Sequence, residues 1–210
     1  MAVIDNGLGP GQTVVNDTFT HVNSLKQWNI YSPLWAPVRT DSTRGLLLED
    51  ADPYDFAKAE RVFPVTKHMQ VEFSLTPCQS DHGQLQIELQ DERNMPAVRL
   101  SFEPDGSLIA KAGARIKKIM DYRSGQAYDM RITLNADTRM YTVNINGEDK
   151  LTQLFFAPVE SFGHIVFRTG EARHFPTADT APEADRDLPN AGERVPEAKF
   201  AIRYLKTQRL

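Results

Sequence analysis

The feature that most constrains the fold of this chain is a strict alternation of apolar and polar residues within Gly83–Ala112. Polar Gln86 and Glu88 alternate with apolar residues in its first half, and Arg99 does so in its second half. Successive side chains of a β-strand point to opposite faces, so this pattern predicts strands with one buried and one wet face. The tight-turn sequence Pro104–Gly106 follows. We expect three antiparallel strands here, and a core that includes Leu85, Ile87, Leu89, Val98, Leu100, Phe102, Val71, Phe73, Ile132 and Leu134.

Short alternating or apolar segments recur along the rest of the chain, separated by turn residues. Many short strands at such spacing predict an all-β sandwich or barrel, and we identify no convincing helix. The further strands are expected at residues 13–19, 24–31, 35–40, 45–49, 58–63, 68–76, 114–120, 128–135, 140–145, 164–169 and 198–206.

The chain reads as one sandwich domain, residues 13–210, after a lead-in. Residues 1–12 contain three glycines and a proline, which predicts a flexible segment. Residues 170–196 form the one long irregular stretch, and it lies between two expected strands. We therefore expect an insertion in a domain, of the kind that is either functional or disordered.

Composition excludes several classes of partner. The formal net charge is −4, which gives no general attraction to nucleic acid or to an anionic membrane. No apolar run approaches the ~20 residues that span a bilayer. One cysteine rules out an internal disulfide. The first residues lack the basic and apolar regions of a signal peptide, which fits either a cytoplasmic protein or a mature or excised chain.

An acidic segment, Asp50, Asp52 and Asp55, has the carboxylates that Ca²⁺ prefers. The EF-hand pattern nevertheless fails, because Tyr54 stands where an acid is expected and Arg61 replaces the glutamate at the twelfth position. We interpret the segment as a solvated acidic turn. The histidines are scattered and there is a single cysteine, so we predict no metal and no cofactor.

Three segments together resemble the concanavalin A-like (laminin G-like) jelly-roll superfamily. DTFTHVNSLKQW resembles its D-x-F…L…W opening, YDMRITLNADTRMYTVNINGE its characteristic hairpin, and AKFAIRYLKT its last strand. RVFP and FRTGEAR are similar to domains that accompany bacterial polysaccharide-degrading enzymes. The resemblance implies an antiparallel jelly-roll β-sandwich and a glycan as partner, and it favours a bacterial protein that is secreted or periplasmic.

Catalytic motifs of that superfamily are missing. Its glucanases carry E-x-D-x-E on one strand face, whereas Glu88 and Asp91 of this chain are an odd number apart and face opposite ways. Its alginate lyases resemble Q-[IV]-H, but here Glu88 follows Gln86 and Ile87. We therefore predict no catalytic residues, although whether the chain is an enzyme stays open.

A polar strand face is the candidate binding site. Gln86 and Glu88 share one face of a strand, and Arg99 and Arg61 are expected beside them. His164 and Arg168 share a face of another strand that leads into the long loop. Arginine's planar fork suits carboxylates and paired sugar hydroxyls, which favours an acidic glycan. An ordinary solvated face is the alternative. The candidate ligand-binding residues are Arg61, Gln86, Glu88, Arg99, His164, Arg168, Arg173 and His174.

Three functions fit these observations. The first is a non-catalytic carbohydrate-recognition or accessory module of a polysaccharide-degrading system. The second is a polysaccharide lyase or glycoside hydrolase acting on an acidic glycan. The third is a structural interaction domain. Because the catalytic motifs are missing, we favour the first.

Overall fold

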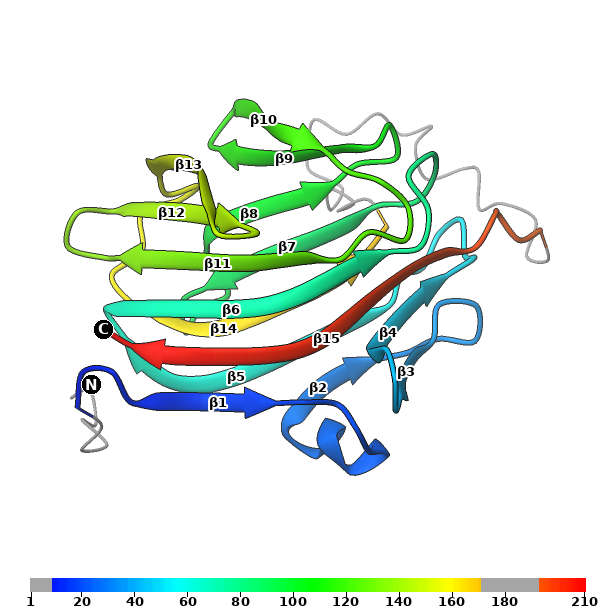
Figure 1. Ribbon diagram of the computed structural model, residues 1–210, viewed down its shortest axis with the longest axis horizontal. Helices are drawn as coiled ribbons and strands as arrows, with labels where there is room; N and C mark the ends of the chain where they lie inside the picture. Colours follow the sequence, from blue (N-terminus) through cyan, green and yellow to red (C-terminus); the bar gives the residue numbers. More distant parts are fainter. Residues whose placement is uncertain (1–8, 171–192) are drawn as a thin grey trace, which may run out of the picture.

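The protein is a sandwich of two antiparallel β-sheets that pack face to face, as the ribbon in Figure 1 shows with one sheet in front of the other. The computed structural model describes residues 9–170 and 193–210. The prediction of an antiparallel jelly-roll β-sandwich is confirmed.

Sheet A has eight strands and is centred on the longest one, β15, which pairs with β1, β4 and β6. Gly11 and Gln12 exchange backbone hydrogen bonds with Arg209 near the end of this strand. The strands of sheet A, in spatial order, are β13 (Glu148–Leu154), β12 (Met140–Ile145), β11 (Tyr128–Asn135), β6 (His68–Pro77), β15 (Ala198–Arg209), β4 (Gly45–Asp50) and β3 (Val38–Asp41), with β1 (Thr13–Asp17) beside β15.

Sheet B has seven strands, and the alternating stretch lies within it as three consecutive neighbours, β9, β8 and β7. This confirms the antiparallel pairing expected from the alternation. The strands of sheet B, in spatial order, are β10 (Arg115–Asp121), β9 (Ser107–Ala112), β8 (Pro96–Phe102), β7 (Leu85–Gln90), β14 (Phe162–Thr169), β5 (Lys58–Thr66) and β2 (Trp28–Tyr31).

Two local predictions are wrong. Residues 22–27 form a 3-10 helix, η1 (Val22–Gln27), where we expected the start of a strand, and only its second half continues as β2. Strand β13 was not expected, because Leu151 alone among its side chains is buried and no alternation results. Both segments lie at edges, where the chain buries few apolar side chains.

The core lies between the sheets and contains all ten of the apolar side chains that we predicted, each with no exposed surface. Aromatic rings join the two layers: Phe73 of sheet A contacts Phe167 of sheet B edge to face at 5.4 Å between ring centroids. Trp28 packs against Phe167 and, edge on, against Phe19.

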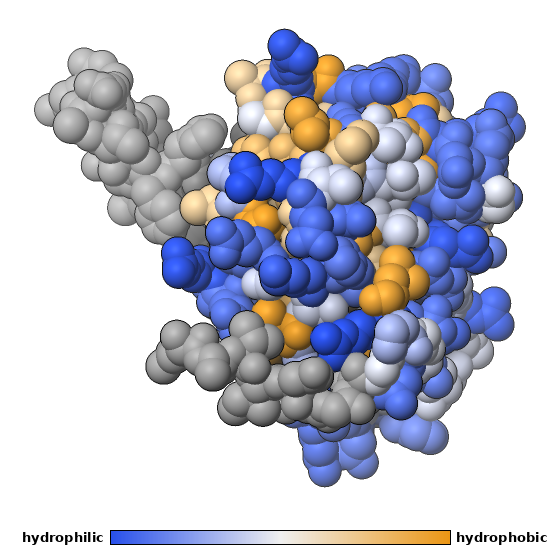
Figure 2. Space-filling model, turned by 90° about the vertical axis from the view of Figure 1, so that its left-hand side faces the viewer, coloured by the Kyte–Doolittle hydropathy of each residue, from blue (hydrophilic) through white to orange (hydrophobic). Residues whose placement is uncertain are grey.

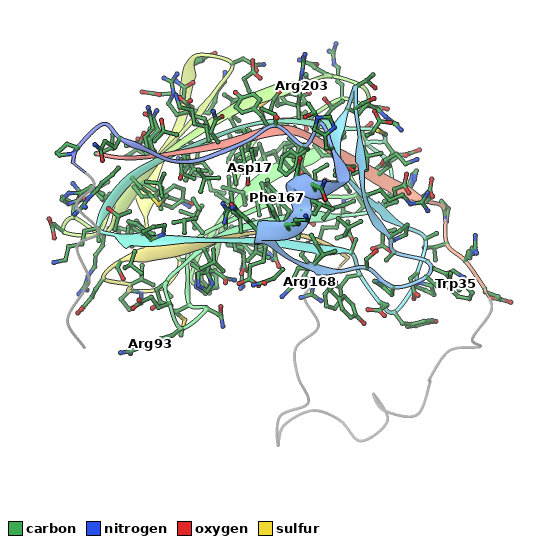
Figure 3. All side chains as sticks on the ribbon, turned by 90° about the horizontal axis from the view of Figure 1, so that it is seen from below. Asp17, Trp35, Arg93, Phe167, Arg168 and Arg203 are labelled. Atoms are coloured by element: carbon green, nitrogen blue, oxygen red, sulfur yellow. The ribbon has the colours of Figure 1, made fainter. Side chains whose placement is uncertain are left out.

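A polar contact also ties the sheets together at Asp17, at the end of β1. Its Oδ2 accepts a hydrogen bond of 2.8 Å from Trp28 Nε1 in β2 and one of 3.0 Å from Arg61 Nε in β5. Figure 3 shows Asp17 and Phe167 in the space between the two layers. We refer to these three side chains, Asp17, Trp28 and Arg61, as the inter-sheet tie.

On the end of the molecule that Figure 2 shows, hydrophilic residues cover most of the surface, and hydrophobic residues lie between them in separate places. Among residues 9–170 and 193–210, no helix is long and apolar enough to be a candidate for crossing a membrane.

Candidate functional site

A polar surface extends across five strands of sheet B on the side that faces away from sheet A. Glu88 lies opposite Arg99 of β8 and Val166 of β14, and Gln86 lies opposite Ser101 and Arg168. Because cross-strand partners share a face, these rows form one surface. We call it the outer face of sheet B; its polar residues are Lys58, Glu60, Gln86, Glu88, Gln90, Arg99, Ser101, Lys111, His164 and Arg168.

The centre of this face is a fixed pair of charges. Arg99 Nε donates a hydrogen bond to Glu88 Oε1 at 2.5 Å, and Gln90 Nε2 donates one to Glu88 Oε2, also at 2.5 Å. The side chain of Glu88 is only 12% exposed. Because both carboxylate oxygens already accept hydrogen bonds, Glu88 orients its neighbours, and this arrangement does not present it as a base.

Two arginines of the face lie over aromatic rings. The guanidinium carbon of Arg99 is 4.2 Å from the ring centroid of Phe156, and that of Arg168 is 3.9 Å from the centroid of Phe56. Such cation–π stacking fixes the plane of a guanidinium. The Phe56 ring in turn contacts Tyr31 at 5.1 Å.

The acidic turn that we predicted lies beside Phe56 and shapes the backbone there. Asp52 Oδ1 accepts hydrogen bonds from the backbone N–H groups of Tyr54 and Asp55, and Asp55 Oδ1 accepts one from Phe56. Asp50 is not solvated as we expected: it is buried, and burial raises the pKa of its carboxyl. Within the described ranges, no group of three potential metal ligands lies close together.

Charge on the outer face of sheet B differs in sign from the charge of the whole chain. Lys58, Arg99, Lys111 and Arg168 are four cations, against the two carboxylates of Glu60 and Glu88. Glu60 lies 3.0 Å from His164 Nδ1 and 3.4 Å from Lys58 Nζ. The acidic turn borders this face at Phe56, where Asp55 Oδ2 accepts a hydrogen bond from Tyr31 at 2.9 Å. The excess of positive charge therefore belongs to the strand residues of the face, in a chain whose net charge is −4.

Five of the eight residues that we predicted as ligand-binding lie on this one face: Gln86, Glu88, Arg99, His164 and Arg168. Arg173 and His174 lie outside the described residues.

Arg61 is a correction to the sequence-based prediction. It pairs with Ile165 of β14 and so points to the core side of sheet B, opposite Glu88 and Arg99. There its guanidinium group donates hydrogen bonds to Asp17 and to the side chain of Gln27, and it is 13% exposed. Its role is therefore to join the sheets.

Sequence reasoning missed Phe156, Lys58 and Glu60 on this face. Lys58, Glu60 and Val62 lie two residues apart along β5, so alternation places their side chains on the same face of the strand. This signal was present in the sequence. Phe156 follows the unexpected strand β13, so no expected strand indicated its direction. Its neighbour Phe155 is buried, and two adjacent aromatic residues with opposite directions were the available hint.

Comparison with known proteins gives one family and several related folds. The family model described as "Sialidase-like, CBM domain" matches residues 28–185. A solved sialidase structure is 39% identical over 95% of this chain, with a TM-score of 0.86, and this chain spans about a fifth (19%) of the sialidase chain. No curated protein matches the sequence.

Two further structures are similar in fold alone. The beta-glucanase of Bacillus licheniformis is 10% identical with a TM-score of 0.66, covering 95% of this chain and 100% of the glucanase. The alginate lyase A1-II′, a member of polysaccharide lyase family 7, is 12% identical with a TM-score of 0.57, covering 93% of this chain and 100% of the lyase. Together with the family model and the sialidase match, they confirm the resemblance to concanavalin A-like jelly-roll proteins.

Proposed function

Because this chain belongs to the family of sialidase-like CBM domains, and is thus a carbohydrate-binding accessory module, we propose that it recognises an acidic glycan through the outer face of sheet B. Family membership confirms the carbohydrate-recognition function that the sequence favoured. The acidity of the ligand and the residues that bind it are our proposal.

One observation carries the proposal: two arginines, Arg99 and Arg168, each lie over an aromatic ring on the same positively charged face. A guanidinium held in a fixed plane loses little conformational freedom when it binds a planar carboxylate with two parallel hydrogen bonds. Between them lies the amide of Gln86, which is buried within this face. Phe56 and Tyr31 add an apolar surface against which a sugar ring could pack.

We further propose that the module acts beside an enzyme that degrades the same glycan. The support is that this chain spans about a fifth of the sialidase that it resembles, as expected for an accessory domain. On this proposal residues 13–210 are one domain, and the protein is bacterial and secreted. Binding then raises the local concentration of the enzyme at its substrate, which is how linked binding modules act.

The proposal is tested by calorimetric titration with three probes: the methyl glycosides of N-acetylneuraminic acid, of glucuronic acid and of glucose. We expect the two acidic sugars to bind and the neutral one to bind at least about tenfold more weakly, since a hydrogen bond to a charged group contributes about 1.5–3 kcal/mol. Arg168→Gln should weaken binding of the acidic sugars by about tenfold or more. Lys111→Ala, which removes a less central charge, should weaken it several-fold.

Arg115→Gln is the matched control, because Arg115 is exposed on β10 and pairs with Ala112, so it does not share the face of Lys111. It should leave binding unchanged. Arg168 is half-buried over Phe56, so the melting temperature of each variant is measured first. A folded Arg168→Gln variant with wild-type affinity would place the site elsewhere, and equal binding of the glucoside would refute the acidic ligand.

A further inference from the structure

A polar pocket lies on the outer side of sheet A, opposite the outer face of sheet B, at the junction of β1, the turn between β3 and β4, and β15. Its volume is about 400 Å³, which is within the range of small-ligand sites. Figure 3 shows Arg203, which lines it, on the other side of the sandwich from Arg168. The lining residues are Asn16, Thr18, Thr20, Ser42, Thr43, Gly45, Arg203, Tyr204 and Lys206.

An irregularity in β15 builds this pocket. The register of β15 against β6 shifts between Ile202 and Tyr204, which is a β-bulge, and the extra residue is Arg203. Ile202 and Leu205 are both fully buried, so Arg203 and Tyr204 both point outward, although they are adjacent. Bulges re-aim side chains in this way and are frequent beside binding sites.

Gly45 allows the turn between β3 and β4 to approach the bulge. Its φ is +94°, and a Cβ atom placed on it would overlap the carbonyl oxygen of Ile202. A glycine is therefore required where the turn meets the backbone of β15. The turn then brings the hydroxyls of Ser42 and Thr43 to the same pocket as Arg203.

The pocket has two cations and no carboxylate among its lining residues. In the described part of the chain, neither Arg203 nor Lys206 has a side-chain hydrogen bond or an ion pair. The nearest acid of the turn, Asp41, already accepts hydrogen bonds from Thr43 and Arg44. Across the ladder, Lys206 lies opposite Glu72 of β6, but Oε1 of Glu72 already pairs with Arg131 Nε at 2.9 Å. Two cations without a direct ion pair among the described residues, beside hydroxyl groups, are suited to an anionic, hydroxylated ligand.

We infer that this pocket is a second sugar-binding site, which takes one anionic sugar residue that carries a carboxylate or a sulfate. Arg203 and Lys206 bind the anionic group, the threonine and serine hydroxyls bind ring hydroxyls, and the partly exposed Tyr204 ring packs against the sugar. The inference does not depend on the outer face of sheet B, which lies on the other sheet. If both sites bind, the module is bivalent and gains avidity on a polyanionic glycan.

The test is a backbone-amide NMR titration of the full chain, because it reports on the two faces separately. The probes are the methyl glycosides of N-acetylneuraminic acid, of galactose 6-sulfate and of glucose, each up to about 50 mM, since one sugar in a shallow pocket binds with a dissociation constant of about 1 mM or weaker. We expect either anionic sugar to shift the amides of residues 16–20 and 42–45, and the neutral glucoside to shift them at least tenfold less. Which anionic probe binds distinguishes a carboxylate from a sulfate as the recognised group.

The variant Arg203→Ala/Lys206→Ala should abolish these shifts and keep any shifts of Gln86 and Arg99. Arg115→Ala/Lys117→Ala removes the same charge from exposed positions of β10 and should change neither set. The inference is overturned if no anionic probe shifts residues 16–20 and 42–45, if the glucoside shifts them equally, or if the double variant still shows the shifts. If the anionic probes shift the amides of residues 16–20 and 42–45 in the wild type but not those of Gln86 and Arg99, the second site is supported and the proposed function is contradicted.

Discussion

Removing the carboxylate of Asp17 is the most informative perturbation of the fold, because this one group holds β1 of sheet A to β2 and β5 of sheet B. Asp17→Ala deletes the acceptor of two hydrogen bonds, from Trp28 at 2.8 Å and from Arg61 at 3.0 Å. The side chain of Arg61 is then left without its counter-ion at 13% exposure.

The magnitude follows from that exposure. Breaking a fully buried ion pair by removing one partner costs about 3–5 kcal/mol. Here the two side chains are 13% and 17% exposed, and Arg61 keeps its bonds to Gln27, so water and the amide compensate in part. We expect Asp17→Ala to lower the free energy of unfolding by about 3 kcal/mol. Asp17→Asn, which keeps an acceptor for Trp28 but removes the charge, should lower it by about 1–2 kcal/mol.

Urea unfolding at pH 7 measures both values, and a double-mutant cycle with Arg61→Met isolates the pair. We expect a coupling energy of about 1–3 kcal/mol between the two positions, since they share a hydrogen bond. A loss of less than about 1 kcal/mol in Asp17→Ala, or additive single and double variants, would refute the claim that this contact ties the sheets.

The remaining predictions concern the core, one glycine, one tyrosine and the acidic turn. Phe102→Ala should lower the free energy of unfolding by about 3–5 kcal/mol in urea, because the ring is fully buried; under about 1 kcal/mol would contradict its place in the core. Gly45→Ala should cost about 3 kcal/mol or more by the same assay, because φ is +94° and the new Cβ overlaps Ile202, whereas a near-neutral result would mean that the turn can move. Burial raises the pKa of Tyr122 to about 12 from about 10, so its contribution to stability is complete below pH 10 and is lost as the pH rises towards 12. The free energy of unfolding, measured at pH 8, 10 and 11, should fall more steeply in the wild type than in Tyr122→Phe. A chelator should leave the melting temperature unchanged, because Asp52 Oδ1 already accepts two backbone hydrogen bonds within the turn. A clear drop in melting temperature that Asp52→Ala abolishes would reveal a metal.

The strands of the centre could be predicted because the direction of each side chain there follows the alternation of apolar and polar residues. Every side chain from Leu85 to Gln90 is buried or nearly so, yet the apolar ones face the core and the polar ones the outer face. The D-x-F…L…W resemblance now has a physical explanation: Asp17 accepts the hydrogen bond of Trp28, and Phe19 packs edge on against the same indole. The sequence resemblance therefore reflects the contacts that Trp28 makes with Asp17 and Phe19.

The candidate site could be predicted only in part. Residues on neighbouring strands of the alternating stretch, such as Glu88 and Arg99, come together by register alone, which a hairpin nearly determines. Arg61 was misplaced because a charged residue was assumed to face water. Ala59, Arg61 and Phe63 lie two residues apart along β5, so alternation placed Arg61 on the core side. Its partners Asp17 and Gln27, 44 and 34 positions away, make that burial acceptable. Such long-range compensation is not visible in a local pattern.

The position of β15 in the chain has a consequence for how the protein reaches its fold. This strand is the last of the described strands in sequence, yet it is central in sheet A, between β6 and β4, and it is the pairing partner of β1. Before residues 198–209 have left the ribosome, β6 and β4 each pair on one side only and expose the other side as an open edge. At that stage β1 has no neighbour in its sheet. Pairing of β1 with β15 closes a loop that contains nearly all of the other strands, and contacts so distant in sequence form slowly. We therefore expect the nascent chain to hold sheet B in a partly ordered form while two halves of sheet A await their common strand, a stage at which exposed edges favour association with other chains.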